Sequence, residues 1–159
     1  MRGLLLALVM GAVVILILSY KRYLDLRLKT LTELSELLSR IRRNTECYMS
    51  ATSPVGLSRK YPILESVGLV ADTERGVSIS EAFIRHGGGL SLSKSAREIM
   101  DELSGAGASS LAHVLDTYRS VEEKLASLAV SEAKENEEKI KVFGGVAFAL
   151  LLGLSMLVL

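Results

Sequence analysis

Residues 3–20 read GLLLALVMGAVVILILSY, and residues 142–159 read VFGGVAFALLLGLSMLVL. Neither stretch contains a charged residue. At a rise of about 1.5 Å per residue, a helix of either length spans about 27 Å, which is close to the hydrocarbon thickness of a bilayer. We therefore expect an all-α protein with transmembrane helices at residues 1–20 and 142–159 and a soluble helical domain at residues 21–141.

Each apolar stretch has an alternative interpretation. The first resembles a signal peptide, but its basic region is Arg2 alone and no small-x-small cleavage motif precedes Lys21. The second resembles a buried core helix, but so short a chain has little other sequence to cover a helix that is apolar on all sides. The sequence favours two membrane anchors over both alternatives.

Composition excludes several classes of function. Lys and Arg number 19 against 18 Asp and Glu, so there is no basic field of the kind that attracts nucleic acid. His86 and His113 are isolated, and no HExxH, CxxC or G-x-S-x-G motif is present. We expect no catalytic residues, metal, cofactor or small-molecule substrate, and hence no enzyme. Cys47, the single cysteine, is expected to be a buried free thiol.

Two leucine-rich segments next to the apolar ends have the spacing of amphipathic helices. No Pro or Gly interrupts residues 18–47, so the first span is expected to continue into the soluble domain as one helix. The last helix is expected to begin at Ser110 and to run on into the second span. We expect the two helices to pack as an antiparallel bundle through two apolar seams. The seams are Leu24, Leu28, Leu31, Leu34, Leu38 and Ile41, and Leu111, Val114, Tyr118, Val121, Leu125 and Leu128.

The region between these helices is broken by turn residues. Ser53-Pro54 predicts a new helix start, Ser78 and Glu81 form a capping box, and Ser93 or Ser95 is expected to cap a later helix. The expected elements are short helices at 55–60, 63–70, 78–85 and 93–103, a polar turn at 71–77, and glycine-rich ends at 87–89 and 105–107. Residues 131–141 are expected to be solvated helix, supported by the pairs Lys134–Glu138 and Glu135–Lys139.

Basic residues border the soluble side of both apolar stretches. Four follow the first and three precede the second, whereas only Arg2 lies beyond them; the seven are Lys21, Arg22, Arg27, Lys29, Lys134, Lys139 and Lys141. The positive-inside rule therefore predicts that the middle domain is cytosolic and that both termini are outside.

Both apolar stretches also carry small residues at every fourth position, which permit close helix packing in a membrane. The alternative is that Gly and Ala are simply common in such helices. The candidate packing residues are Gly3, Ala7 and Gly11, and Gly145, Ala149 and Gly153.

The chain resembles a known family, the stage III sporulation protein AB of endospore-forming bacteria. Residues 132–157, EAKENEEKIKVFGGVAFALLLGLSML, look like the closing segment of that family. The order of parts is also similar: an N-terminal span, a Leu-rich helix, the Ser53-Pro54 break, a middle helix entered through Leu90-Ser91-Leu92, and a long last helix.

The resemblance implies a role in the channel between mother cell and forespore. It implies a location in the mother-cell membrane facing the forespore. It also implies a soluble domain similar to the cytosolic domains of type II secretion and type IV pilus platform proteins. Such a scaffold would link a cytosolic ATPase to other channel proteins in the membrane. The alternatives are a membrane regulator, or an accessory subunit of a transporter, that transmits through its helices.

The first cytosolic helix carries the candidate contact surface for the ATPase. Its charged outer face is left free if the apolar seam is used within the bundle. A merely solvated face is the alternative, since helix surfaces are commonly charged. The candidate residues are Glu33, Glu36, Arg40, Arg42 and Arg43.

Overall fold

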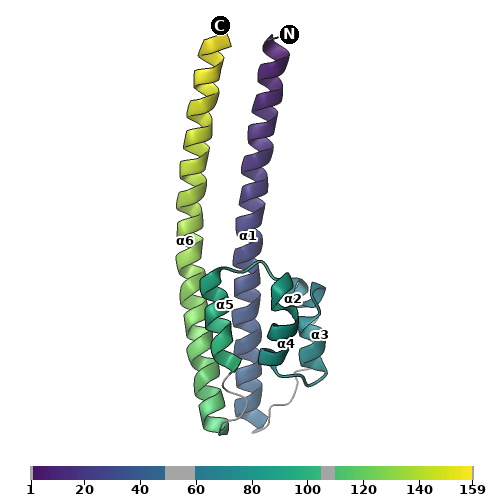
Figure 1. Cartoon of the computed structure of the whole chain (residues 1–159). Coiled ribbons are helices and arrows are strands. Elements are labelled where there is room, and N and C mark those ends of the chain that lie inside the picture. The colour runs from purple at the N-terminus through teal and green to yellow at the C-terminus, as the bar shows by residue number, and fades with distance from the viewer. Residues whose placement is uncertain (1, 49–59, 105–109, 159) are drawn as a thin grey trace. The chain divides into compact units, whose positions relative to one another are not determined.

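The computed structural model describes residues 2–48, 60–104 and 110–158, and for residues 2–6, 48, 154, 155, 157 and 158 it describes the backbone only. The described residues are mostly helical and contain no strand, which confirms the all-α class (Figure 1). The elements are α1 (Arg2–Tyr48), α2 (Pro62–Ser66), α3 (Leu69–Glu74), α4 (Ile79–His86), the 3₁₀ turn η1 (Gly87–Gly89), α5 (Lys94–Asp101) and α6 (Leu111–Val158). The expected breaks at Ser53-Pro54 and at residues 105–107, and the expected helix at 55–60, lie outside the described residues.

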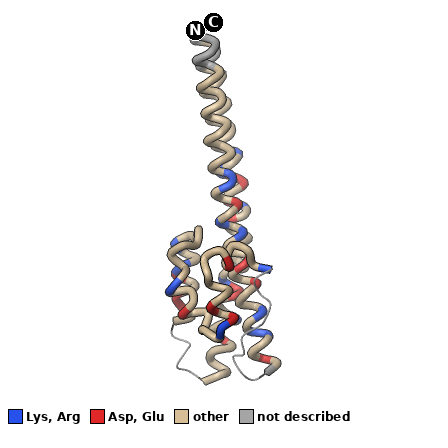
Figure 2. Tube along the Cα trace, turned by 90° about the vertical axis from the view of Figure 1, so that its right-hand side faces the viewer, with Lys and Arg blue, Asp and Glu red and all other residues tan. Residues whose placement is uncertain are grey.

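The chain divides into two compact units. A terminal unit contains residues 1–26 and 131–159, and a middle unit contains Arg27–Val130. Both long helices continue without a break through the boundary, as residues 18–47 and the segment from Ser110 predicted. Residues 7–20 of α1 and residues 142–153 of α6 contain no Lys, Arg, Asp or Glu (Figure 2).

In the terminal unit, one narrow stripe of each long helix is shielded from solvent. On α1 the shielded residues recur every three or four positions: Val9, Val13, Ile17, Tyr20 and Leu24. On α6 they are Glu132, Asn136, Ile140, Gly144, Ala147 and Leu151. The rings of Tyr20 and Phe143 lie 5.5 Å apart between their centroids, so the two helices are in contact at this level. The remaining described apolar side chains of the unit are exposed.

Helix α1 contains the candidate membrane span found among the described residues. By length and composition, Ala7–Cys47 is long and apolar enough to cross a bilayer, a property that signal sequences and core helices can share. Only 6% of its most apolar window is buried within the chain. A helix that formed the core of a soluble protein would be mostly covered.

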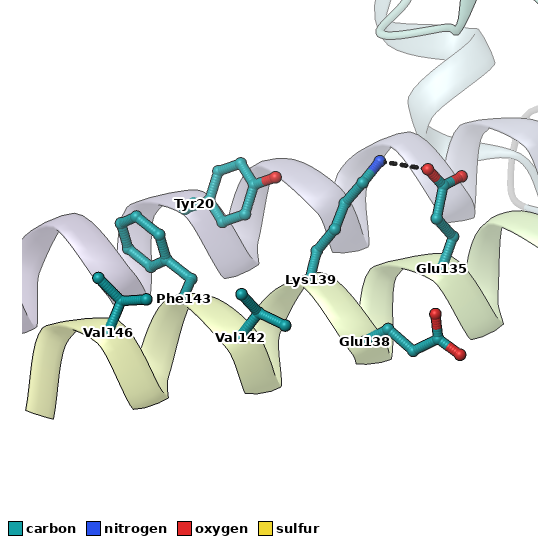
Figure 3. A pocket seen from close by; sticks show the side chains of 7 residues that line it. All are labelled: Tyr20, Glu135, Glu138, Lys139, Val142, Phe143 and Val146. Carbon is teal, nitrogen blue, oxygen red and sulfur yellow. Dashed lines mark ion pairs between the residues drawn. The ribbon is translucent and has the colours of Figure 1, made fainter. Parts of the chain in front are cut away.

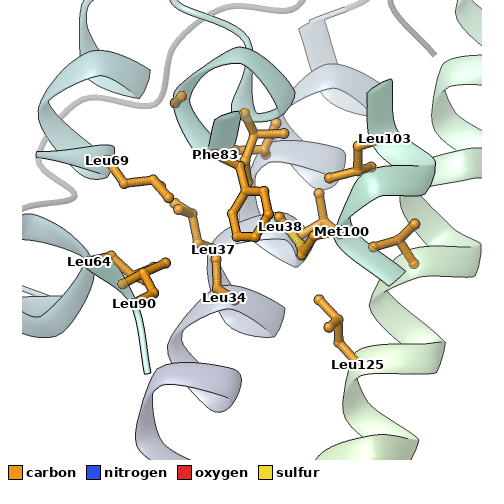
Figure 4. Close-up of a cluster of buried hydrophobic side chains, with 14 of the residues drawn as sticks. Leu34, Leu37, Leu38, Leu64, Leu69, Phe83, Leu90, Met100, Leu103 and Leu125 are labelled. Carbon is orange, nitrogen blue, oxygen red and sulfur yellow. The ribbon is translucent and has the colours of Figure 1, made fainter. Parts of the chain in front are cut away.

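The middle unit contains one hydrophobic core, to which all six helices contribute (Figure 4). Four leucines of α1 are almost completely buried, and α6 adds Tyr118, Val121 and Leu125. Burying one such leucine contributes about 1.5–3 kcal/mol relative to leaving it exposed. The buried leucines of α1 are Leu31, Leu34, Leu37 and Leu38. Leu37 lies outside the predicted seam, so the apolar stripe is wider than predicted, whereas Leu111 of the second seam is exposed.

The short helices begin largely at the predicted caps. The Ser78 hydroxyl accepts a hydrogen bond from the Glu81 N–H at 3.2 Å, and the Ser93 hydroxyl accepts one from the Ala96 N–H at 3.1 Å. Of the two candidate caps for α5, the structure therefore selects Ser93. Each bond satisfies an N–H that the first turn of a helix leaves without a partner.

Two expectations in this region are wrong. Residues 63–70 do not form one helix, because Gly68 adopts φ +91° and separates α2 from α3. Residues 71–77 are not a turn throughout, since α3 continues to Glu74. A Cβ at Gly68 would lie 3.3 Å from Cε1 of His86, so both the backbone angle and the neighbouring ring favour glycine here.

Arg97 of α5 holds the glycine triplet of η1 in place. Arg97 donates from Nη1 to the Gly87 carbonyl and from Nη2 to the Leu90 carbonyl, each at 2.9 Å. A Cβ on Gly87 would lie 3.0 Å from the Phe83 ring, which explains why a residue without a side chain stands there. These contacts position η1 against the core.

Candidate functional site

Glu33, the first residue of the candidate ATPase surface, is used within the middle unit. Its Oε2 accepts hydrogen bonds from the N–H groups of Ile63 at 3.0 Å and Leu64 at 3.2 Å. Pro62 at the first position of α2 has no N–H, so these are the donors that α2 leaves open. A carboxylate from another helix therefore caps α2, and it also lies at the positive end of the helix dipole.

Arg42 is also engaged within the middle unit. Its Nε donates to Oε2 of Glu122 on α6 at 2.8 Å, and its Nη1 donates to Oε1 of Glu46 at 2.6 Å. The side chains of Arg42 and Glu122 are 15% and 21% exposed. Burial acts to raise the pKa of Glu122, but hydrogen bonds from Arg42 and Ser39 outweigh it and the pKa is lowered. The Glu122 hydrogen bond likewise raises the pKa of Arg42.

The remaining members of the candidate surface differ in exposure. Glu36 and Arg43 are exposed, and Arg40 is partly buried. The five residues that the sequence placed on one charged face therefore have two kinds of role. Glu33 and Arg42 hold other elements of the middle unit, whereas Glu36, Arg40 and Arg43 make up the part of the face that a partner can reach. We call these three residues the outer face of α1.

A cluster that the sequence did not indicate lies between α3 and α4. The Asp72 carboxylate is 3.0 Å from Nε2 of His86, 3.4 Å from Nη1 of Arg85 and 3.5 Å from Nη1 of Arg75. The His86 hydrogen bond, followed by Arg85, lowers the pKa of Asp72. Residues 75–78 join α3 to α4. Because the sequence predicts a turn at residues 71–77, it gives no reason to expect the Asp72 carboxylate on a helix beside Arg85 and His86.

The small residues predicted to pack helices in the membrane face away from the shielded stripe wherever their side-chain positions are described. Ala7, Gly11, Gly145, Ala149 and Gly153 are exposed, and a Cβ placed on any of the three glycines would meet nothing within 4 Å. The side-chain position of Gly3 lies outside the described part. The ladders are therefore not used in the described contact between α1 and α6, where Gly144, Ala147 and Leu151 are shielded instead.

Two further features bear on chemistry. Cys47 is exposed, so the expectation of a buried thiol is wrong; it lies at the end of α1, on the opposite side from the leucine stripe. A cavity of about 140 Å³ in the middle unit is lined by Ser78, Ser80, Glu81, Ile84, Leu103, Ser104, Val114 and Tyr118. Burial raises the pKa of Tyr118. Among the described residues, no group of three His, Cys, Asp or Glu side chains is arranged to hold a metal ion.

Of the predicted helical ion pairs, Glu135–Lys139 is present at 2.7 Å. A second pair, Glu137–Lys141 at 2.7 Å, was not predicted, and it lowers the pKa of Glu137 and raises that of Lys141. No model of a known protein family, no curated protein and no solved structure matches the chain.

Proposed function

We propose that the protein is a membrane-anchored scaffold of a mother-cell to forespore channel, which links a cytosolic ATPase to channel proteins in the membrane. The observation that carries the anchoring is the exposed apolar part of α1, which nothing in the described chain covers beyond one narrow stripe. The sporulation setting and the ATPase rest on the family resemblance. The protein has no catalytic role in this proposal.

The second anchor and the bundle belong to the same proposal. The apolar part of α6 is exposed at Val142, Val146, Phe148, Leu150 and Leu152, which is the pattern expected of a lipid-facing helix. In our proposal α1 and α6 cross the membrane in opposite directions, and the middle unit is an antiparallel bundle in the cytosol. The basic residues that border both spans support this orientation.

The outer face of α1 is the surface that we propose for the ATPase. Charged side chains that are not engaged within the unit can pair with a partner without breaking the fold. Glu36 and Arg43 are exposed, with Arg43 near enough to Glu122 to act on it through its charge alone, and Arg40 lies beside them on the helix. Glu33 and Arg42 are excluded from the proposed surface because their replacement would disturb α2 and the contact with Glu122.

The test is co-purification of the cognate ATPase with the full chain from membranes. The double variant Arg40→Glu, Arg43→Glu is expected to lower ATPase recovery about tenfold or more at low salt, since like charges placed at an interface cost several kcal/mol. The control is Lys60→Glu, Lys94→Glu, which reverses the same number of exposed charges elsewhere in the middle unit. It is expected to retain the ATPase.

Equal recovery with both double variants would remove the outer face from the proposal. Failure of the unmodified chain to retain any ATPase would contradict the scaffold itself and favour a regulator or a transporter subunit. Circular dichroism of each variant shows whether the helices remain formed, so that a loss of binding is not confused with a loss of fold.

A further inference from the structure

The terminal unit contains a groove that runs along α6. Its volume is about 480 Å³, and it is lined by Tyr20 of α1 and six residues of α6. Val142, Phe143 and Val146 line one end, and Glu135, Glu138 and Lys139 line the other (Figure 3). The ring of Tyr20 lies beside Phe143, 5.5 Å away between centroids, and closes the groove from the side of α1.

The lining of the groove changes from polar to apolar at one position along α6, just before residue 142. Residues 142–146 are apolar and belong to the proposed second span, whereas residues 135–139 are polar and precede it. Tyr20 stands at the matching end of the first span, and aromatic side chains with a polar tip are common at the level of lipid headgroups. The groove therefore has the same order of apolar and polar parts as a phospholipid that lies beside the span.

The charges at the polar end select among headgroups. Lys139 forms an ion pair with Glu135 at 2.7 Å, and among the described residues no ion pair engages Glu138, which is exposed. Among the residues that line the groove, two carboxylates and one ammonium give this end an excess negative charge, and the Glu138 carboxylate also interacts with Lys141, which does not line the groove. An anionic headgroup is disfavoured there, whereas a headgroup with both a phosphate and a primary ammonium matches the two signs present.

We propose that this groove binds a phospholipid with a primary amine in its headgroup, of the phosphatidylethanolamine type. The headgroup ammonium donates to the Glu138 carboxylate, the phosphate lies near Lys139, and the start of one acyl chain lies on Val142, Phe143 and Val146. A quaternary ammonium headgroup has no N–H to donate, so the site distinguishes ethanolamine from choline lipids. The inference rests on the proposed membrane anchoring and goes beyond it by naming the lipid.

The experiment is native mass spectrometry of the full chain, purified from membranes in mild detergent. Phosphatidylethanolamine, phosphatidylcholine or phosphatidylglycerol with identical acyl chains is added, and the lipid-bound fraction is measured. Phosphatidylethanolamine is expected to exceed each of the others about three- to fivefold, the ratio that one hydrogen bond of about 1 kcal/mol from the ammonium to the Glu138 carboxylate supplies.

Two variants, each with a matched control, distinguish the headgroup contact from a general attraction of lipids to the span. Glu138→Gln is expected to abolish the preference for the ethanolamine lipid over the choline lipid, so that the two bind about equally. Glu137→Gln is the matched control: this residue is next in the chain, 69% exposed and paired with Lys141, but it does not line the groove. It is expected to retain the preference. Phe143→Ala is expected to weaken all three lipids, and Phe148→Ala, also exposed in the span, is not.

Several outcomes overturn the inference. Equal binding of the three lipids, a preference for phosphatidylglycerol, or equal effects of Glu137→Gln and Glu138→Gln would each do so. Co-purification of a protein in place of a lipid, lost on Phe143→Ala, would assign the groove to a partner helix. Alkaline extraction of membranes distinguishes failure of the proposed membrane anchoring from failure of the lipid site. Release of the chain contradicts both the anchoring and the lipid site. Retention of the chain without a lipid preference contradicts the lipid site alone.

Discussion

Glu33 shows how a single side chain can link two parts of the middle unit that are distant in the sequence. Replacing it with Ala leaves the N–H groups of Ile63 and Leu64 without their acceptor. We expect Glu33→Ala to lower the free energy of unfolding by about 1–2 kcal/mol, as for the loss of a helix cap, and Glu33→Gln to lower it less. Urea unfolding of the full chain in detergent micelles, followed by circular dichroism, measures both.

Glu36→Ala is the control for this prediction, because Glu36 is exposed on the same helix. It is expected to change the free energy of unfolding by less than about 0.5 kcal/mol. An effect of Glu33→Ala as small as that of Glu36→Ala would show that the cap contributes nothing.

Asp72 provides a prediction about pH. Its pKa is lowered in the folded chain by the hydrogen bond with His86 and by Arg85, so folding favours the ionised carboxylate. The stabilisation is fully present above the unfolded pKa of about 4 and is lost as the pH falls through the lower, folded pKa. Wild type is therefore expected to be more stable than Asp72→Asn at pH 6, with the difference shrinking below about pH 4.

Thermal unfolding across this pH range measures the difference. Asp101→Asn is the control, since Asp101 is exposed at the end of α5. A gap between wild type and Asp72→Asn that stays constant from pH 6 to pH 3 would mean that the carboxylate does not act through its charge.

At the scale of the elements, the pairing of α1 with α6 in the middle unit can be measured through Arg42 and Glu122. A double-mutant cycle with Arg42→Met and Glu122→Gln is expected to give a coupling of about 1 kcal/mol, because both side chains are largely shielded. The control cycle uses Lys124 and Glu102, which join α6 to the residue that follows α5 and are 47% and 44% exposed. That exposed pair is expected to give about 0–0.5 kcal/mol.

The same two helices show what the sequence can predict. Their continuity follows from apolar residues at three- and four-residue spacing, without Gly or Pro in residues 18–47 and 110–141. The Ser78 cap follows from local pattern alone, whereas local pattern left Ser93 and Ser95 as alternative caps of α5. The α2–α3 junction was not predicted, because nothing in the local pattern of residues 63–70 shows that Gly68 adopts φ +91° and lies against the His86 ring, 18 residues later in the chain. The sequence also does not reveal that Glu33 and Arg42 act within the unit, because the N–H donor of Ile63 lies 30 residues from Glu33 and the Glu122 acceptor lies 80 residues from Arg42. Local periodicity holds no information about such contacts.

For the whole molecule, the exposed Cys47 provides a test of orientation without any fusion. In our proposal Cys47 is cytosolic, so a membrane-impermeant maleimide is expected to label it only after the membrane is permeabilised. A Cys47→Ser chain with a single cysteine appended after Leu159 is expected to be labelled in intact vegetative cells made to produce the chain, in which the extracytosolic side of the membrane faces the medium. Labelling of native Cys47 in intact cells would reverse the orientation, and mass spectrometry of the modified chain reads out each case.

The core of the middle unit also has a consequence for synthesis of the chain. Leu34 and Leu125 belong to one buried cluster, yet about 90 residues separate them. At a translation rate of about 5–20 residues per second, the ribosome needs roughly 5–18 s to supply the second after the first. Throughout that interval the nascent chain, which in our proposal is already anchored in the membrane by its first apolar segment, exposes a leucine stripe that its last helix has yet to cover. Newly made chains are therefore open to chaperones, and to one another, until translation has nearly ended.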